Sequence, residues 1–498
     1  RSVRIIMEPY HHFLIRGLFL MNTYSYDLLV DKSIKRKIKI LQILLEANRP
    51  VSLKTFSDLC DVSFKTIQQD VAYLIDNLPN ALLLEEFNHT LSLEKYGPSR
   101  EIVTYIDSLI SDNPIFHIIE SIFYEEKKDL VTYALDLYIS ESTMKNHIRT
   151  FRNVLKDFRL DLDTTTFSLV GDEANIRYFF FQYFRSIHES SAPIIHNDQY
   201  HEITEVLEKM KRDYDLNLNF DYYRATIWMF IIEKRIENQH FIEFDASILE
   251  KYENKDSYRR FKTAFSTYFH SKVPKENNRN QEILFSYFAQ VDTIIYESNS
   301  SYLTNDFIQE FTEQDLLITN FFIASKQNLV LNHKAKSAIQ SYLTNLSILT
   351  ECTDLFQKYS RILIRKAKNN YSDTFSIWCH ILKNHDYFSQ VEDVAARLTL
   401  LYEVKKYNKK KVLFALTGDS SSVSYYKALA KKVIPNDVEY HFLFNRPLTN
   451  ELLSTLQIDL CVYNFEPQLH LTSSDLYRLS DIPLDTEWQE LQDLLFNI

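Results

Sequence analysis

The chain has 498 residues, too many for a single hydrophobic core, so several domains are expected. With 45% hydrophobic and 25% charged residues it resembles a soluble globular protein, while its 4 glycines argue against Gly-rich nucleotide loops and turn-rich β architectures. The net charge of −11 lies almost wholly beyond residue 160, because residues 32–160 carry 17 Lys and Arg against 18 Asp and Glu.

The N-terminal residues carry no targeting signal that we recognise. Residues 13–21 (FLIRGLFLM) contain an arginine and are too short to span a bilayer, so neither a membrane anchor nor a signal peptide is predicted. We assign residues 1–30 to an N-terminal extension and exclude residues 1–20 from the fold argument, with an alternative start at Met21. Cysteines stand far apart in apolar contexts, which predicts buried thiols, no metal, no cofactor and a reducing cytoplasm. Their positions are Cys60, Cys352, Cys379 and Cys461.

Residues 31–98 have the element order of a winged helix-turn-helix domain. Residues 33–48 place apolar side chains at helical spacing, and Ser52 is suited to cap a second helix. Residues 62–78 (VSFKTIQQDVAYLIDNL) then predict a third helix, followed by a two-stranded hairpin. The apolar row of this third helix consists of Ile67, Val71, Leu74 and Leu78.

The same order of elements returns in residues 99–172. Residues 139–155 (ISESTMKNHIRTFRNVL) repeat the third helix, with two helices before them and a hairpin after them. The repeated apolar row consists of Met144, Ile148, Phe151 and Leu155. Because five elements recur in the same order, the sequence predicts a second winged helix-turn-helix domain.

Local signals mark the borders of these two domains. Gly97 and Gly171, two of the four glycines, are predicted to close the two hairpins. Pro114 is predicted to occupy the first turn of a helix, with Asp112 or Asn113 as its cap.

Burial of one row leaves the opposite face of each third helix exposed. Glutamine and asparagine can pair with adenine, arginine and lysine with guanine, and hydroxyls can reach phosphates. We therefore predict that both helices enter the major groove of double-stranded DNA. The candidate DNA-binding residues are Lys65, Thr66, Gln68, Gln69, Ser142, Thr143, Lys145, Asn146, Arg149 and Arg152.

The second of these helices is predicted to be the stronger reader, because its exposed face is a basic stripe that continues to Lys156. The exposed face of the first helix has one lysine and is expected to include the acidic residues Asp70 and Asp76. Its phosphate contacts would come from upstream cations at Lys35, Arg36, Lys37 and Lys39. The wing tips at residues 88–89 and 164–166 either touch DNA or are plain hairpin turns. A polar face used to bind protein is the alternative for either domain.

The two winged helices, a long aromatic-rich helical region and a small α/β tail together resemble the Mga-like transcriptional regulators of Gram-positive bacteria. These regulators often govern virulence and carbohydrate responses. The resemblance implies a mainly α multidomain protein with PRD-like helical domains at residues 173–290 and 291–400. It also implies an α/β domain similar to enzyme IIB of sugar phosphotransferase systems at residues 401–498.

By the same resemblance, phosphocarrier proteins of the phosphotransferase system would phosphorylate histidines of the two bundles. The candidate phosphoacceptors are His188, His201, His240, His333 and His380. The chain departs from the family near the start of one helix, where Trp228 stands in a region that often holds a histidine. This departure puts phosphorylation of the first bundle in doubt.

The tail begins with a strand and a loop that opens a helix, which is a natural anion site. Enzyme IIB proteins carry a phosphorylated cysteine there, whereas residues 415–421 (ALTGDSS) contain none. The tail is therefore expected to serve oligomerisation or sensing.

We thus predict a cytoplasmic, DNA-binding transcriptional regulator that is not an enzyme and forms a homodimer or higher oligomer. The alternatives are a phosphotransferase phosphocarrier and a scaffold that binds only protein. An RNA-binding antiterminator is set aside, because such proteins begin with a β-rich module and this chain begins with helices.

Overall fold

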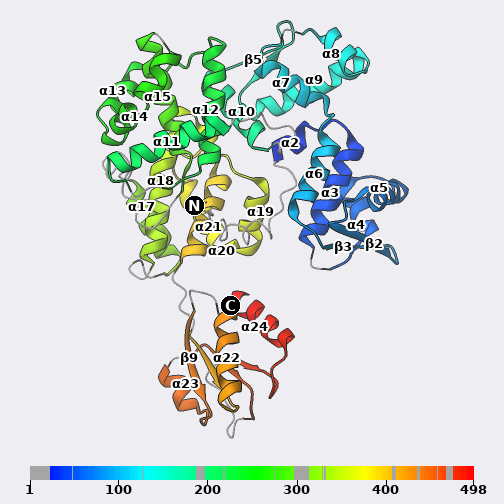
Figure 1. Ribbon diagram of the computed structural model, residues 1–498, viewed down its shortest axis with the longest axis vertical. Coiled ribbons are helices and arrows are strands. Elements are labelled where there is room, and N and C mark those ends of the chain that lie inside the picture. The colour runs from blue at the N-terminus through cyan, green and yellow to red at the C-terminus, as the bar shows by residue number, and fades with distance from the viewer. Residues whose placement is uncertain are drawn as a thin grey trace, which may run out of the picture. The chain divides into compact units, whose positions relative to one another are not determined.

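A computed structural model describes residues 23–47, 49–126, 128–186, 197–216, 219–273, 275–295, 313–327, 329, 332–406, 411–434, 438–456, 458–466 and 475–497. Contacts divide the chain into two compact units. Unit 1 comprises Arg1–Gln327 and Ser337–Leu401, and unit 2 comprises Asn328–Lys336 and Tyr402–Ile498 (Figure 1). The protein is mainly helical, with one small parallel sheet in unit 2.

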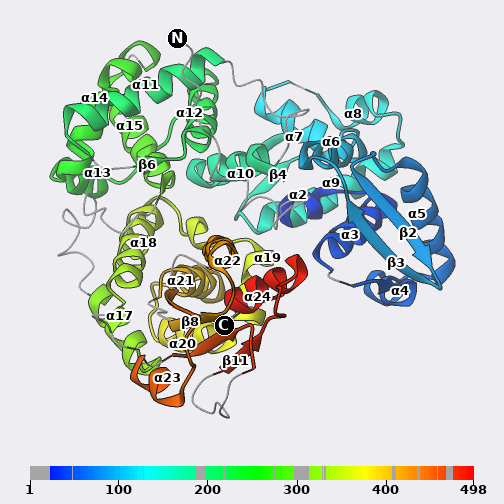
Figure 2. The same cartoon turned by 60° about the horizontal axis from the view of Figure 1, so that its bottom comes forward.

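The first helix-turn-helix region has the predicted order of helices and ends in an antiparallel hairpin, β2–β3 (Figure 2). The side chain of Ser52 accepts a hydrogen bond from the amide of Thr55 at 3.1 Å, which confirms the predicted cap. β1 adds to the hairpin in the order β1-β3-β2. The elements are α3 (Lys32–Glu46), β1 (Val51–Ser52), α4 (Leu53–Cys60), α5 (Phe64–Asn77), β2 (Leu82–Phe87) and β3 (Thr90–Lys95).

The second region has an additional first helix, α6, followed by the order of three helices and a hairpin seen in the first region, with a shorter wing. Its hairpin pairs three residues of each strand, from Asp161 opposite Val170 to Asp163 opposite Ser168. The elements are α6 (Ser99–Ile110), α7 (Pro114–Phe123), α8 (Leu130–Asp136), α9 (Glu141–Lys156), β4 (Asp161–Asp163) and β5 (Ser168–Val170).

Both hairpins close at glycine, as predicted, and the reason is steric. A Cβ on Gly97 would stand 2.7 Å from the Cβ of Ala81, the residue just before β2. A Cβ on Gly171 would stand 2.5 Å from the Leu160 side chain, just before β4, and Gly171 also has a φ of +149°. In both units the backbone therefore passes so close to the start of the wing that only glycine fits.

Part of the presumed N-terminal extension belongs to the core, which corrects the sequence prediction. α2 (Thr23–Leu28) packs against α9 and α10, and both Leu28 and Leu29 are buried. The side chain of Asn113 donates to the carbonyl of Leu28 and accepts from the amide of Val30, both at 3.2 Å. Asn113 precedes α7 as expected, but its side chain holds this segment and makes no capping hydrogen bond.

The next helices bury one face rich in aromatic side chains. Phe181 of α10 stacks on Trp228 of α12 with 4.0 Å between ring centroids, and both residues are buried. A short antiparallel pair, β6–β7, was not predicted. The elements are α10 (Glu173–Ser186), α11 (Asn197–Asp213), β6 (Asn219–Phe220), α12 (Tyr222–Glu237), α13 (Ala246–Glu253), α14 (Asp256–Lys272), α15 (Glu276–Val291) and β7 (Ile294–Ile295).

A second set of helices repeats this stack. Phe321 of α17 lies on Trp378 of α20 with 4.1 Å between centroids. A break separates a 3-10 turn from α19, and in this break the amide of Tyr359 donates to Asp393 at 2.6 Å. The elements are α17 (Glu313–Ala324), α18 (His333–Cys352), the 3-10 turn (Asp354–Gln357), α19 (Arg361–Asn370), α20 (Ser372–Leu382) and α21 (Val391–Lys405).

Unit 2 contains a four-stranded parallel sheet in the order β11-β10-β8-β9. Alternate residues of β8 enter two cores on opposite faces: Val412 and Phe414 pack with α22 and α24, and Leu413 and Ala415 pack with α23. The elements are β8 (Lys411–Leu416), α22 (Ser420–Val433), β9 (Glu439–Phe444), α23 (Asn450–Leu456), β10 (Leu460–Tyr463), β11 (Asp475–Arg478) and α24 (Asp485–Asn497).

Candidate nucleic-acid interface

The two helix-turn-helix units share the geometry of their turns. Asp61 and Tyr138 stand at equivalent positions, two residues before the next cap, with φ of 52° and 54°. After each of them, a backbone amide returns to the preceding helix: Val62 to the carbonyl of Ser57 at 3.2 Å, and Ile139 to that of Ala134 at 2.9 Å. A residue in the left-handed conformation therefore sets the direction of α5 and of α9 relative to the helix before each.

Both third helices also begin with the same serine–threonine cap. Ser63 accepts from the amide of Thr66 at 3.2 Å, and Ser140 accepts from the amide of Thr143 at 3.1 Å. The two hydroxyls of each pair are hydrogen-bonded to one another at 2.9 Å. Thr66 and Thr143 are half-buried, so their hydroxyls serve the caps, whereas both were predicted as DNA contacts.

The predicted apolar rows are buried, so the opposite faces lie at the surface. On α5, Ile67, Val71 and Leu74 are at most 1% exposed, and Leu78 is half-buried beyond the end of the helix. The row of α9 is likewise buried at Met144, Ile148, Phe151 and Leu155. The predicted contacts that the structure leaves exposed are Lys65, Gln68, Gln69, Ser142, Lys145, Asn146 and Arg149.

The exposed face of α9 holds two cations with weak internal ties. The side chain of Lys145 is 63% exposed, and its Nζ lies 3.9 Å from Oε2 of Glu141, one turn earlier. Arg149 donates to the amide oxygen of Asn146 at 3.4 Å. Exposed pairs of this kind contribute little to stability, so both cations can be redirected to another partner at small cost.

Arg152 was predicted as a further free cation of this face, but it is bound to the wing. Its guanidinium donates to both oxygens of Asp161 in β4, from Nε at 2.7 Å and from Nη2 at 3.1 Å. Hydrogen bonds from Arg152 hold the pKa of Asp161 below its usual range. The basic stripe is therefore interrupted, and sequence inspection could not show that a wing carboxylate ends beside α9.

His147 of α9 was not singled out from the sequence. It is half-buried, and burial lowers its pKa, so it adds no positive charge to the helix at neutral pH. Its place between Lys145 and Arg149 was the only sequence signal.

On α5, Asp70 was expected to face outward but is buried. It accepts from Arg36 Nε at 2.6 Å and from the hydroxyl of Ser33 at 2.9 Å. Asp76 stays exposed. The outer face of α5 is consequently less acidic than predicted, with Lys65 and two glutamines at the surface.

The upstream cations were predicted to hold phosphates, and each has a partner within the protein. Arg36 binds Asp70, as above. Lys35 donates to the carbonyl of Asp27 at 3.2 Å, and Lys39 donates to that of Leu59 at 2.5 Å. Lys37 lies 3.9 Å from the ring centroid of Tyr73. These contacts remove the support for a phosphate clamp on α3.

The wings are acidic and tightly turned. Asn88 and His89 both have positive φ at the first tip, and the ring of His89 meets Phe64 of α5 edge to face at 5.5 Å. In the second wing, Asp163 accepts from the amide of Thr165 and the hydroxyl of Thr166, both at 2.8 Å. Both tips are thus held by local contacts, which favours the plain-turn interpretation.

The candidate phosphoacceptors lie in different surroundings. His201, His333 and His380 are exposed, whereas His188 lies outside the described residues. The Nε2 of His240 stands 2.6 Å from Glu125, which follows α7 in the second helix-turn-helix unit.

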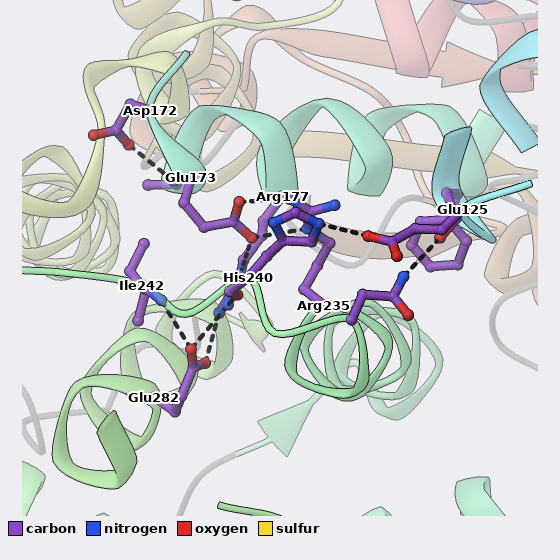
Figure 3. A network of polar contacts seen from close by, with 11 residues as sticks. Glu125, Asp172, Glu173, Arg177, Arg235, His240, Ile242 and Glu282 are labelled. Atoms are coloured by element: carbon purple, nitrogen blue, oxygen red, sulfur yellow. Dashed lines mark hydrogen bonds and ion pairs between the residues drawn. The ribbon is translucent and has the colours of Figure 1, made fainter. Parts of the chain in front are cut away.

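A buried network lies behind His240 (Figure 3). Arg177 of α10 is fully buried and makes a bidentate pair with Glu282 at 2.7 and 2.9 Å. It also donates to the carbonyl of His240 and to Glu173, both at 2.9 Å. Arg235 binds both oxygens of Glu173, and hydrogen bonds from the arginines hold the pKa of Glu173 low despite its burial. The start of α10 is thereby fixed to α12 and α15.

The loop that opens α22 in unit 2 has its own anion. The carboxylate of Asp419 accepts from the amides of Ser421 at 2.9 Å and Ser422 at 2.8 Å, which lowers its pKa. Cys461 is buried in the sheet, and burial raises its pKa to about 12. The amides that were predicted to bind an anion thus already donate to the carboxylate of Asp419.

Comparisons with known proteins agree with this geometry. Residues 31–86 match the family described as the M protein trans-acting positive regulator (MGA) HTH domain, and residues 98–184 match the Mga helix-turn-helix domain. The capsule synthesis positive regulator AcpB of Bacillus anthracis is 22% identical, over 93% of this chain and 98% of its own length. The two helix-turn-helix units are thus Mga-type domains, and relatives named as positive regulators match most of the chain.

Other relatives of this chain carry similar names. The capsule synthesis positive regulator AcpA of Bacillus anthracis is 24% identical over 80% of this chain and 85% of its own length. The anthrax toxin expression trans-acting positive regulator of the same organism is 20% identical over 94% and 99%. These names describe regulators and not enzymes. Among the described helices, none is long and apolar enough to cross a membrane, and no group of side chains in the same residues could hold a metal ion.

Proposed function

We propose that this protein is a DNA-binding transcriptional regulator, of the activating type, that binds double-stranded DNA through α5 and α9. The observation that carries the proposal is the pair of helix-turn-helix units with one turn geometry, one cap and two exposed polar ridges. The names of the relatives, which are positive regulators, support the same role. A regulator of this kind acts in the cytoplasm.

α9 is the main reader in this proposal, because its cations are exposed and weakly paired. Lys145 and Arg149 would contact guanine or phosphate, and Asn146 would contact adenine. On α5, Gln68 and Gln69 would add adenine contacts with little charge. Two readers of modest affinity gain from a second copy of the chain, since linkage raises their effective concentration.

The test is a titration of the full chain against genomic DNA fragments in a mobility-shift assay at several salt concentrations, followed by footprinting. Binding should weaken steeply with salt, because each neutralised phosphate contributes nearly one unit to the slope of log K against log salt. Two protected segments per chain are expected. A folded protein that shifts no fragment at low salt would favour the protein-binding scaffold.

The helical regions at residues 173–290 and 291–400 would act as PRD-like sensors, phosphorylated on histidine by phosphocarrier proteins. The exposure of His201, His333 and His380 supports such access, whereas His240 would have to leave Glu125. His188 stays a candidate by sequence alone. Incubation with the general phosphotransferase proteins, followed by mapping in His→Ala variants, tests this role. Complete absence of phosphohistidine would contradict it.

Unit 2 would serve oligomerisation in the manner of an enzyme IIB-like domain that has lost phosphotransfer. Its parallel sheet and the Asp419 cap support this assignment. Light scattering of the full chain should give at least twice the 59.2 kDa mass of one copy. A monomer at micromolar concentration would contradict it.

A further inference from the structure

Three arginines from three helices of unit 1 gather around the aromatic core of the first helical region. Arg185 at the end of α10 and Arg224 at the start of α12 both approach the Phe181 ring, with Cζ atoms 5.9 and 5.5 Å from its centroid. Arg397 of α21 approaches from the second helical region, 4.5 Å from the Tyr359 ring centroid. The charges of all three arginines act on the hydroxyl of Tyr178.

This arginine cluster has fewer negative charges than positive ones. The carboxylate of Asp292 accepts from Nη2 of Arg224 at 2.5 Å and from Nε1 of Trp228 at 3.2 Å. Arg397 donates to the carbonyl of Lys358 at 2.6 Å. The carboxylate one turn before Arg397, Asp393, accepts from the backbone of Tyr359. Two carboxylates therefore face three guanidinium groups.

Several donors of the cluster lack an acceptor. The Nε atoms of Arg224 and Arg397 are buried and have no hydrogen-bond partner in the described chain. Arg185 is exposed and forms no salt bridge with any residue that the structure describes. A buried N–H without an acceptor destabilises the folded state, and more so when the group is charged. Desolvation by the surrounding protein, and after it the positive charge of Arg224, lower the pKa of Arg185.

An anion would relieve both deficits at once. A phosphate group supplies several strong acceptor oxygens and at least one full negative charge, and planar guanidinium groups bind it bidentately. We propose that Arg185, Arg224 and Arg397 form a binding site for a small phosphate-bearing anion. Because Arg185 remains exposed and Arg224 is one-quarter exposed, the ligand can enter from solvent.

The place of the site in the fold gives the ligand a role. Arg185 and Arg224 belong to the first helical region, and Arg397 belongs to the second, so a bound anion ties α10 and α12 to α21. α10 begins three residues after the wing of the second helix-turn-helix unit. The anion thus acts as an effector that fastens the helical regions behind the reader. This role does not depend on DNA binding.

The experiment measures binding of inorganic phosphate and inorganic pyrophosphate to the full chain, by calorimetry and by thermal shift at constant ionic strength. The wild-type chain should bind at least one probe saturably and melt at a higher temperature in its presence. Arg185→Gln should weaken binding by roughly tenfold or more, because one charge-assisted hydrogen bond is lost. Since Arg185 has no salt bridge in the described chain, this variant should fold normally.

Two controls separate this site from other positive surfaces. Arg260→Gln removes an arginine with a similar single ring contact, 5.6 Å from Tyr214, and should bind like the wild type. The double variant Lys145→Ala/Arg149→Ala should also bind the probes unchanged, since its losses lie on α9. Equal binding by Arg185→Gln and wild type, loss of binding in the α9 variant, or no saturable binding at millimolar probe would each overturn the proposal.

Discussion

The first and second helix-turn-helix units have one scaffold and different surfaces. Their turns share a left-handed residue and a returning amide hydrogen bond, and their caps share a serine–threonine pair, yet α9 presents two cations while α5 presents one lysine and two glutamines. The acids make this difference smaller than the sequence predicts: Asp70 of the first helix-turn-helix unit is buried against Arg36, and Asp161 of the second pairs with Arg152. A helix-turn-helix scaffold therefore sets where a ridge points, and the partners of its charges set what the ridge can bind.

The largest effect should come from the charges of α9. Lys145→Ala/Arg149→Ala should reduce DNA affinity by several kcal/mol, at roughly 1–3 kcal/mol for each lost contact. Fluorescence anisotropy with a bound fragment measures the loss, and the melting temperature should not change. The control Arg259→Ala/Lys368→Ala removes the same charge from exposed pairs elsewhere and should bind normally. Equal losses in both variants would reduce the role of α9 to net charge.

The second effect concerns the stability of the first helix-turn-helix unit. Asp70→Ala should lower the free energy of unfolding by about 1–3 kcal/mol, because it leaves Arg36 largely buried without its carboxylate. Asp76→Ala, on the exposed side of the same helix, should change it by less than about 0.5 kcal/mol. Urea unfolding, with signals resolved for each unit, measures both. Similar values for the two variants would show that the inward pair contributes nothing.

A smaller effect is expected on the first reader. Lys65→Ala/Gln68→Ala/Gln69→Ala should weaken DNA binding by about 1–3 kcal/mol in total, less than the α9 variant. Its salt slope should fall by about one unit, since one cation is lost. Anisotropy titrations at several salt concentrations give both numbers. A loss larger than that of the α9 variant would reverse the ranking of the two units.

The smallest effect should follow release of Arg152. Asp161→Asn removes the wing carboxylate, so the freed guanidinium should strengthen DNA binding by a few-fold. Stability should change by less than about 1 kcal/mol, since the pair is exposed. The same anisotropy assay measures the gain, and Asp163→Asn on the same wing serves as the control. Weaker binding by Asp161→Asn would mean that the pair orients α9 for DNA.

Much of the fold could be predicted because helix signals are local. The Ser52 cap, the apolar rows and the two wing glycines each follow from a few neighbouring residues. The charge partners could not be predicted, because Arg152 and Asp161 meet only after the wing folds back. Asp70 is an intermediate case: it falls between Ile67 and Val71 on the buried row, so helical spacing alone could have placed it inside. The burial of Leu28 and Leu29 was not predicted, because residues 1–30 were assigned to an N-terminal extension.

Glu173 has a mechanical consequence for signal transfer. It follows the second wing by three residues, and two arginines hold its carboxylate in the helical region. A linker this short, anchored at its far end, cannot act as a swivel. Any signal that moves α10 must therefore carry the wing with it, so the helical region would control the second reader as a lever.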